Sequence, residues 1–241
     1  MTTELKGKFA LVTGAARGLG AIIAEDLARQ GVNVAGVDIR ADRLADEMNR
    51  ISTAHGVQTM AIEADAAADR QVEAAVGRVF AAWGRIDILI NNAGIRKVAP
   101  IADIGTAMWD EIHAVNLRGQ FLFTREVLKQ GMLGQNEGTI IYISSGSGRR
   151  GEKNSATYCA SKFGGVGLAE SVAKDLKDTQ IRVTTIAPGM IWTPMAEESE
   201  VAHLDLEWLD PRHVSGAVLF CIQQDPDTII PELHIYHRAQ I

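Results

Sequence analysis

Short runs rich in valine and isoleucine alternate along this chain with longer segments of helical pattern, and this alternation restricts the possible folds most. The runs are FALVT (9–13), VNVAGVD (32–38), VQTMAIEAD (57–65), RIDILINNAG (85–94), GTIIYISS (138–145), IRVTTIAPG (181–189) and a last strand at 232–236. Between the runs, apolar residues recur three and four positions apart, as in Leu44, Met48 and Ile51, which is typical of amphipathic helices. The pattern predicts an α/β fold, a single doubly wound Rossmann-type domain with a mostly parallel seven-stranded sheet and helices on both faces.

Length and charge limit the function classes. The chain has 241 residues, of which 46% are hydrophobic and 22% charged, and its formal net charge is −6. This charge disfavours nucleic acid and anionic membranes as partners. No stretch holds the roughly 18 successive apolar residues of a membrane span, and the start lacks a hydrophobic signal core, so we expect a cytoplasmic protein. Without any linker composition, we expect one domain over residues 1–241.

The cysteines and histidines predict neither a disulfide framework nor a metal site. Cys159 and Cys221 are the only two cysteines, and their spacing fits no zinc motif. The histidines lack carboxylate or cysteine partners at ligand spacing. We therefore expect both thiols to be reduced and structural.

The segment TGAARGLG (13–20) follows the first apolar run and precedes a helical pattern, and this context raises a glycine pattern above chance. Gly14 permits a tight turn, Gly18 lets the backbone approach a pyrophosphate, and Gly20 permits close packing of helix on strand. The helix N-terminus supplies free N–H groups and a partial positive charge. The segment predicts a dinucleotide-binding loop, the alternative being an ordinary glycine-rich turn.

Asp38 ends the second apolar run. A carboxylate there can accept hydrogen bonds from both hydroxyls of an adenosine ribose, and it repels the additional phosphate of NADP. Arg17 and Arg40 are of the type that binds such a phosphate and favour the opposite choice. We give more weight to the carboxylate and expect NAD, with NADP as the less favoured cofactor. The alternative role of Asp38 is to cap a helix that begins near Ala41.

The order and spacing of TGAARGLG, NNAG (91–94) and YCASK (158–162) resemble the short-chain dehydrogenase/reductase family over nearly the whole chain. The resemblance implies an enzyme that transfers a hydride between NAD(H) and a small secondary alcohol or a ketone or sugar substrate. It also implies a homodimer or homotetramer. The helices expected at 104–132 and 156–177 are those that would form the interface.

Tyr158 and Lys162 are four residues apart in a helical pattern, so they lie on one helix face. A neighbouring ammonium lowers the pKa of a phenol from its usual value near 10, which suits proton transfer. The resemblance makes Tyr158 the general acid/base and gives Lys162 a second role at the nicotinamide ribose. It assigns Ser145 to the substrate oxygen and Asn116 to a water that relays protons. Ser144 is the rival of Ser145, and strand alternation predicts that only one of them reaches the site.

The same resemblance implies further contacts with the cofactor. Asp65 would contact the adenine, Asn91 begins the turn that flanks the cofactor, and Thr193 would bind the nicotinamide carboxamide. The expected cofactor residues are Gly14, Arg17, Gly18, Leu19, Gly20, Asp38, Asp65, Asn91, Ala93, Gly94, Tyr158, Lys162, Pro188, Gly189 and Thr193.

Basic residues follow two of the strand ends and suggest a small anionic substrate, a carboxylate, sulfonate or phosphate. They are Arg96, Lys97, Arg149, Arg150 and Lys153. As alternatives, these charges are simply solvated, or they pair with six carboxylates of a lid expected at about 192–211. The six are Glu197, Glu198, Glu200, Asp205, Glu207 and Asp210. Trp192, with Trp208 and Met195, would line the apolar side of the pocket.

Three other functions compete with this interpretation. One is an NADP-linked reductase of 3-oxoacyl thioesters, which the basic loop would suit and Asp38 disfavours. Another is a regulatory protein that binds NAD without catalysis, against which Ser145, Tyr158 and Lys162 argue. A sugar nucleotide epimerase or dehydratase would need a separate C-terminal substrate region, for which the chain leaves no room.

Overall fold

A single parallel sheet organises the chain. The computed structural model describes residues 3–198 and 207–241, and the sheet order is β3-β2-β1-β4-β5-β6-β7, with every neighbouring pair parallel. The strands are β1 (Phe9–Thr13), β2 (Asn33–Asp38), β3 (Thr59–Glu63), β4 (Ile88–Asn91), β5 (Glu137–Ile143), β6 (Gln180–Pro188) and β7 (Glu232–Ile235). All seven predicted strands are present, and the predicted fold class is confirmed.

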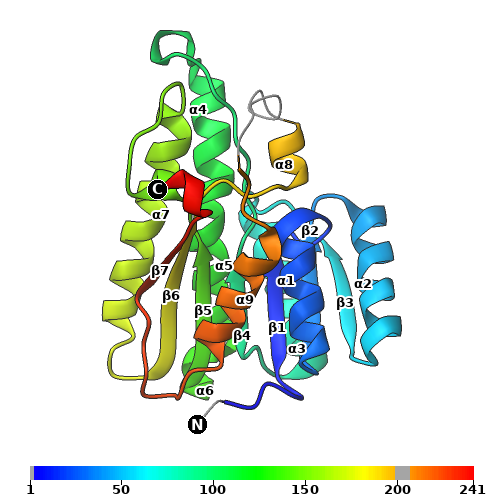
Figure 1. Cartoon of the computed structure of the whole chain (residues 1–241). Helices are drawn as coiled ribbons and strands as arrows, with labels where there is room; N and C mark the ends of the chain where they lie inside the picture. Colours follow the sequence, from blue (N-terminus) through cyan, green and yellow to red (C-terminus); the bar gives the residue numbers. More distant parts are fainter. Residues whose placement is uncertain (1–2, 199–206) are drawn as a thin grey trace.

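The helices form a layer on each face of the sheet (Figure 1). The first layer holds α1 (Gly18–Arg29), α2 (Ala41–His55) and α9 (Pro211–Ile222). The second holds α3 (Asp69–Trp83), α4 (Thr106–His113), α5 (Gly119–Val127) and α7 (Ala156–Asp175). Shorter elements are α6 (Leu133–Gln135), α8 (Pro194–Glu197), the 3-10 turns η1 (Ile101–Asp103), η4 (Gly146–Gly148) and η6 (Arg238–Gln240), and the π-helical turns η2 (Ala114–Arg118) and η3 (Leu128–Met132).

Each helical layer packs on the sheet through its own apolar core. In α2, the buried side chains are Leu44, Met48 and Ile51, the residues whose spacing predicted the helix. They join residues of α1, α9 and the strands in one core, while α3, α5 and α7 form the other. Because both faces are covered, the central strands are buried along almost their whole length rather than at alternate residues.

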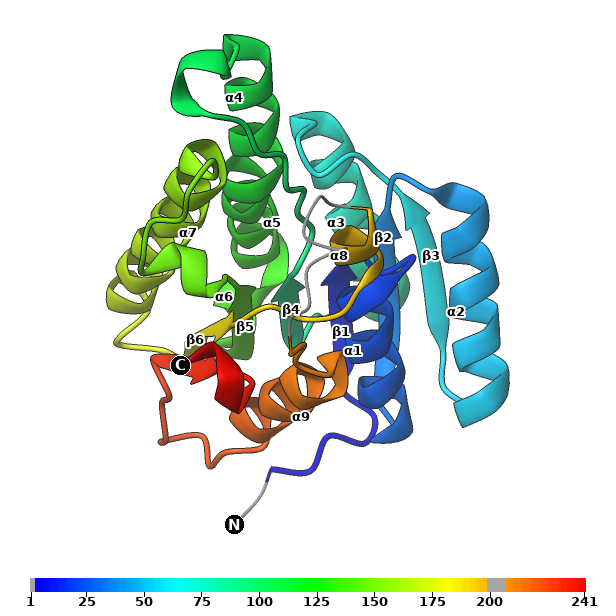
Figure 2. The ribbon, with the colours of Figure 1, turned by 45° about the horizontal axis from the view of Figure 1, so that its top comes forward.

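The strand order reverses between β1 and β4. From β1 the chain runs outward through β2 to β3, returns to β4 on the opposite side of β1, and continues outward to β7. In such sheets a crevice opens at the carboxyl ends of the two strands that flank the reversal. In Figure 2 the short helix α8 lies above these strand ends. Among the residues that the structure describes, no helix has the length and apolar character needed to span a membrane.

The role of the α2 core can be tested with a truncation. Leu44→Ala removes a fully buried side chain and should lower the free energy of unfolding by about 2–5 kcal/mol. Ile229→Ala is the matched control, because Ile229 is 58% exposed, and it should change stability by no more than about 0.5 kcal/mol. Denaturant unfolding measures both, and equal losses in the two variants would contradict the packing described.

Candidate active site

A cleft opens at the carboxyl ends of the central strands. Its volume is about 310 Å³, and residues that follow β1 to β6 line it together with part of α7. We call the part lined by residues 13, 14, 17–20, 37–40 and 64–66 the β2 end, and the part lined by residues 143–147, Arg96, Arg150, Glu152, Tyr158 and Lys162 the α7 end. The cleft thus lies at the reversal of strand order, where the topology places a ligand site.

The glycine loop at the β2 end can admit a phosphate group. Gly14 and Gly18 have φ of +68° and +60°, a backbone conformation that favours glycine. A Cβ on Gly20 would lie 2.1 Å from the carbonyl oxygen of Gly14, so only glycine fits there. Helix α1 begins at Gly18 without any side-chain cap. Its first residues, Gly18, Leu19 and Gly20, line the cleft. Uncapped N–H groups at a helix start suit the pyrophosphate of a dinucleotide.

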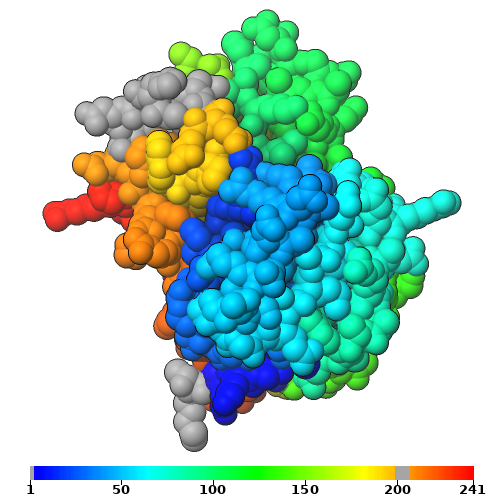
Figure 3. All heavy atoms as spheres, turned by 90° about the vertical axis from the view of Figure 1, so that its right-hand side faces the viewer, coloured from blue at the N-terminus to red at the C-terminus, as the bar shows by residue number. Residues whose placement is uncertain are grey.

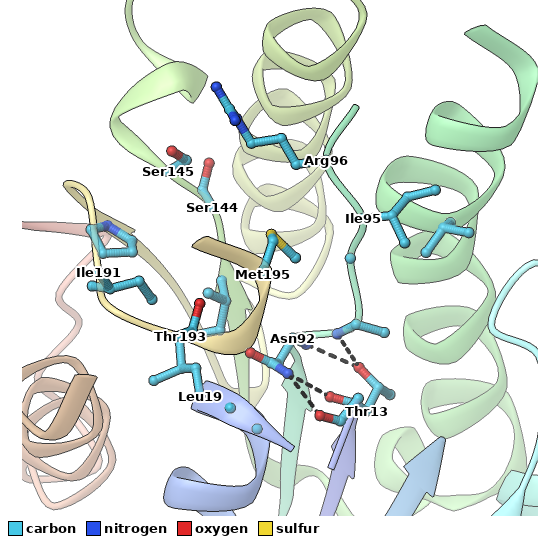
Figure 4. A pocket seen from close by; sticks show the side chains of 18 of the residues that line it. Thr13, Leu19, Asn92, Ile95, Arg96, Ser144, Ser145, Ile191, Thr193 and Met195 are labelled. Atoms are coloured by element: carbon cyan, nitrogen blue, oxygen red, sulfur yellow. Dashed lines mark hydrogen bonds between the residues drawn. The ribbon is translucent and has the colours of Figure 1, made fainter. Parts of the chain in front are cut away.

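Thr13 and Asn92 tie the glycine loop to the turn after β4 (Figure 4). The Thr13 hydroxyl accepts hydrogen bonds from the N–H groups of Asn92 and Ala93, both at 2.9 Å, and the Asn92 amide donates to the Thr13 carbonyl at 2.8 Å. The sequence analysis missed both residues as parts of the site. The second asparagine of NNAG was the available signal for Asn92.

Asn91, expected beside the cofactor, is not brought to the cleft. Its side chain is buried on the other side of the strand end, where its amide donates to the Thr124 hydroxyl at 3.0 Å. Asn91 is the last residue of β4, and successive side chains of a strand point to opposite faces. Ala93 and Gly94 of the same motif do line the cleft.

The Asp38 carboxylate lies at the β2 end and is 5% exposed. One oxygen accepts a hydrogen bond from the Ala16 N–H at 3.1 Å, and the other accepts from the Arg40 backbone and side chain at 3.1 and 2.9 Å. Asp38 is not the helix cap considered as its alternative role, because α2 begins after Arg40 and has no side-chain cap. Asp65 also lines this end, and its carboxylate accepts from the Ala67 N–H.

Arg17 connects the glycine loop to the segment after β6. Its guanidinium binds both carboxylate oxygens of Glu198, one of them at 2.8 Å. A Cβ on Gly18 would lie 3.4 Å from Pro194 of α8, so α8 rests on the loop. In Figure 3 the yellow residues of this region touch the blue N-terminal part of the chain. Residues 199–206 of the expected lid, Glu200 and Asp205 among them, lie outside the described residues.

Tyr158 and Lys162 lie on one face of α7, as their spacing predicted, and both are buried at the cleft. The Lys162 Nζ atom is 5.7 Å from the centre of the Tyr158 ring and donates to the Ile143 carbonyl at 3.0 Å. The strand end of β5 therefore holds the ammonium beside the phenol.

Burial controls the ionisation of both groups. It raises the pKa of Tyr158 to about 12, although a hydrogen bond with Ser145 and the charge of Arg96 act in the opposite direction. It lowers the pKa of Lys162 to about 8. The expected lowering of the phenol pKa by the ammonium is therefore wrong for this structure. The ammonium lies over the ring, and loss of hydration outweighs its attraction.

Ser144 and Ser145 both line the cleft, so the prediction that only one of them could reach it is wrong. Strand β5 ends at Ile143, and beyond that residue the alternation of a strand no longer applies. The Ser145 hydroxyl accepts from the Ser147 N–H at 3.2 Å and interacts with Tyr158. The Ser144 hydroxyl is buried and has no hydrogen-bond partner among the described residues.

Asn116 lies in the π-helical turn η2 and is fully buried. Its side chain accepts from the Ile95 N–H at 2.8 Å and donates to the Ile95 carbonyl at 2.9 Å and to the Ser161 hydroxyl at 3.1 Å. It does not line the cleft, but it holds the loop after NNAG against α7.

Pro188, Gly189 and Thr193 line the cleft after β6, as expected. Gln240, the penultimate residue, holds the start of this segment, because its side-chain amide accepts from the Met190 N–H and donates to the Met190 carbonyl, both at 3.0 Å. The same amide donates to the Glu207 carbonyl at 2.7 Å. Sequence reasoning gave no signal for this role of the C-terminus.

The basic residues separate into two groups. Arg96 and Arg150 line the cleft at the α7 end. Arg149, Lys153 and Trp192 do not line it, so the structure does not bring these three expected substrate residues to the cleft. Arg149 instead binds Glu170 at 2.6 Å and Glu232 at 2.7 Å, because the two neighbouring arginines of an irregular loop point in different directions.

Lys97 and the described lid carboxylates have other partners than those expected. Lys97 pairs with Glu111. Glu198 binds Arg17, and Asp210 binds Arg212. Within residues 3–198 and 207–241, no lid carboxylate forms an ion pair with any of the five basic residues.

Two of the three expected apolar residues face the cleft. Met195 and Trp208 line it, whereas Trp192 packs edge-on against Trp208, with ring centres 5.0 Å apart. Trp192 therefore supports the wall from behind. In the described part of the chain, no group of three or more His, Cys, Asp or Glu side chains is arranged to hold a metal ion.

The pKa of Lys162 predicts how stability depends on pH. Because the pKa falls from 10.5 to about 8 on burial, the unfolded chain binds more protons than the folded protein between these values, and stability rises with pH there. Relative to Lys162→Met, the wild-type free energy of unfolding should increase by about 2 kcal/mol from pH 7 to pH 9.5. Denaturant unfolding of both proteins at the two pH values measures this difference. A constant or falling difference would show that Lys162 is not buried as described.

Comparisons with known proteins agree with this geometry. The family model for short chain dehydrogenase matches residues 8–203. Levodione reductase of Leifsonia aquatica is 37% identical over 227 residues, which cover 93% of this chain and 82% of that protein. A 3-oxoacyl-(acyl-carrier-protein) reductase of Staphylococcus epidermidis is 38% identical over 192 residues, which cover 78% of this chain and 77% of that protein.

A solved structure shares the whole architecture. It is a metagenomic short-chain oxidoreductase in complex with NADP, 31% identical, with a TM-score of 0.85 over 97% of this chain and 98% of that chain. The strand order, the uncapped glycine loop and the Tyr158–Lys162 pair are thus accompanied by similarity along nearly the full length. The chain belongs to the short-chain dehydrogenase/reductase family.

Proposed function

We propose that this chain is an NAD-dependent oxidoreductase that interconverts a small secondary alcohol or sugar and its ketone. One observation carries the proposal: Ser145, Tyr158 and Lys162 line the same cleft as the uncapped start of α1. The glycine loop suits a dinucleotide, and the polar side chains at the α7 end suit a reacting oxygen. A dinucleotide site and a site for an alcohol oxygen in one cleft suit hydride transfer, since a nicotinamide cofactor, when bound, accepts a hydride from the alcohol carbon or returns it.

The residues at the α7 end position the substrate oxygen and move its proton. Ser145 and Tyr158 offer two hydroxyls to that oxygen. In oxidation Tyr158 acts as the phenolate, whose oxygen receives the hydroxyl proton as the carbon loses its hydride, and in reduction the phenol returns the proton to the oxygen. Lys162 is charged below its pKa of about 8, and its charge favours the phenolate of Tyr158 against the burial that raises the pKa of the phenol. Its hydrogen bond to the Ile143 carbonyl keeps it in place.

Removal of the phenol hydroxyl tests this role. Tyr158→Phe should lower kcat for NADH-linked reduction of a ketone panel by about 10²–10⁴-fold, while NADH binding measured by fluorescence stays within about threefold. Tyr142→Phe is the matched control, since Tyr142 is buried in β5 and does not line the cleft. Full activity of Tyr158→Phe would refute proton transfer by the Tyr158 hydroxyl. NADH binding without turnover of any panel member would instead favour the regulatory protein.

The preference for NAD over NADP rests on the charges at the β2 end. The Asp38 carboxylate faces that part of the cleft and would repel an additional phosphate. Arg40 and Arg17, which favour NADP, are already paired with Asp38 and Glu198. The similar metagenomic short-chain oxidoreductase was solved in complex with NADP, which favours the opposite preference.

Removing the charge of Asp38 measures this preference. Asp38→Asn should lower the ratio of kcat/KM with NAD to kcat/KM with NADP by about tenfold or more, since a charged acceptor is lost and Arg40 is released. Asp42→Asn, in the first turn of α2 and outside the cleft, should leave the ratio unchanged. A wild-type preference for NADP, or an unchanged ratio in Asp38→Asn, would contradict the proposal.

A second candidate is the NADP-linked reduction of 3-oxoacyl thioesters. The relative that is 38% identical, named as a 3-oxoacyl-(acyl-carrier-protein) reductase, favours it. Asp38 argues against it, and the cofactor measurement separates the two candidates.

We also propose a homodimer or homotetramer. Exposed aromatic side chains on α4, α5 and α7, namely Trp109, Phe121 and Phe163, support this assembly.

A further inference from the structure

Two guanidinium groups face the α7 end from separate loops. Arg96 follows β4 and Arg150 follows β5, and both line the cleft with Ser145 and Tyr158. The Arg96 Cζ atom lies 5.9 Å from the centre of the Tyr158 ring. Figure 4 shows the Arg96 side chain extending from the loop after β4 toward Ser144 and Ser145. A molecule of a few carbon atoms can therefore reach the phenol and this guanidinium together.

Neutral contacts hold both side chains. The Arg96 Nη2 atom is 3.5 Å from the Ser155 hydroxyl, and the Arg150 Cζ atom lies 5.6 Å from the centre of the Tyr236 ring. An arginine stacked on an aromatic ring keeps its N–H donors free at the edge of the guanidinium plane. These contacts restrict the two groups without neutralising them.

The charge of the two groups is not balanced by a bound carboxylate. Within residues 3–198 and 207–241, no ion pair forms at Arg96 or Arg150, whereas Arg17, Arg40 and Arg149 each bind a carboxylate. Glu152 is a carboxylate that lines the same end. With two guanidinium groups and one carboxylate, the α7 end carries an excess of positive charge, although the net charge of the whole protein is −6. A cleft with such an excess attracts anionic ligands.

We propose that the substrate is a small hydroxy or oxo compound with an anionic oxygen group, which Arg96 and Arg150 bind while its alcohol or carbonyl faces Ser145 and Tyr158. Carboxylate, sulfonate and phosphate share the chemistry that a guanidinium fork recognises. This inference rests on the proposed function. The reaction is unchanged: the carbinol carbon gives a hydride to the bound nicotinamide, its hydroxyl gives a proton to Tyr158, and the anionic group keeps its charge.

Pairs of an anionic compound and a neutral counterpart test the inference. The probes are 2- and 3-oxo acids of four and five carbons and 4-oxopentanoate, each with its amide, 1-hydroxypropan-2-one phosphate with 1-hydroxypropan-2-one, and 2-oxopropanesulfonate with its sulfonamide. Turnover is measured as kcat/KM with NADH. Binding is measured by calorimetry with enzyme loaded with NAD, which cannot reduce an oxo compound. The carboxylate, phosphate and sulfonate arms identify which anionic group is bound.

We expect at least one anionic probe to exceed its neutral partner at least tenfold in kcat/KM and in affinity. Arg96→Gln and Arg150→Gln should each lower the ratio of the value for that anion to the value for its neutral partner by about 10- to 100-fold, in kcat/KM and in affinity. Arg96→Lys, which keeps the charge, should recover part of the loss. Lys153→Gln removes a charge from the same loop as Arg150 but outside the cleft, and it should behave as wild type.

Equal values for every anion and its neutral partner would overturn the inference, as would an equal loss in Lys153→Gln. Turnover of neutral compounds without a preference for anions would leave the proposed function standing and the inference wrong. If no compound is turned over, the binding arm still decides. Selective anion binding that depends on Arg96 and Arg150 would then support the anion site and refute the oxidoreductase function, whereas its absence would refute both.

Discussion

The hydrogen bonds of the Thr13 side chain join β1 to β4, the two strands between which the cleft opens. Its hydroxyl donates to the Ile90 carbonyl at 3.2 Å and accepts from the N–H groups of Asn92 and Ala93. The ladder between β1 and β4 ends at Val12 and Ile90, so the backbone groups beyond these residues need other partners. One side chain supplies the missing partners. It thereby sets the spacing between the glycine loop and the turn after β4.

A second set of hydrogen bonds joins the loop after β4 to α7, the helix that carries Tyr158. Ile95, just beyond NNAG, binds the side chain of Asn116 through both its N–H and its carbonyl. Asn116 donates to the Ser161 hydroxyl, which in turn donates to the Tyr158 carbonyl at 2.7 Å. The π-helical turn at Asn116 is thus a structural link between β4 and α7. Such turns occur at functional positions because they redirect a side chain within a helix.

Charge divides the cleft into two regions. At the β2 end each arginine is paired with a carboxylate, Arg40 with Asp38 and Arg17 with Glu198, which leaves little attraction for an additional phosphate. At the α7 end Arg96 and Arg150 have only neutral contacts among the described residues. Gln240, the penultimate residue, binds Met190 and Glu207, which precede and follow α8 in the chain.

The sequence by itself determined the fold and most of the polar site. The alternation of apolar runs and amphipathic segments depends on burial, which is periodic and therefore visible in a single chain, and the conformational demands of Gly14 and Gly18 are equally local. The spacing of Tyr158 and Lys162 likewise fixed their common helix face.

The tertiary structure decided what depends on neighbours distant in the chain: the pairing of Arg149 with Glu170 and Glu232, the turning of Asn91 toward Thr124, and the role of Gln240. It also decided the pKa of Tyr158, because burial arises only when α7 packs against the strand ends. Side-chain direction in loops and loss of hydration have no periodic signature, so only the folded chain reveals them.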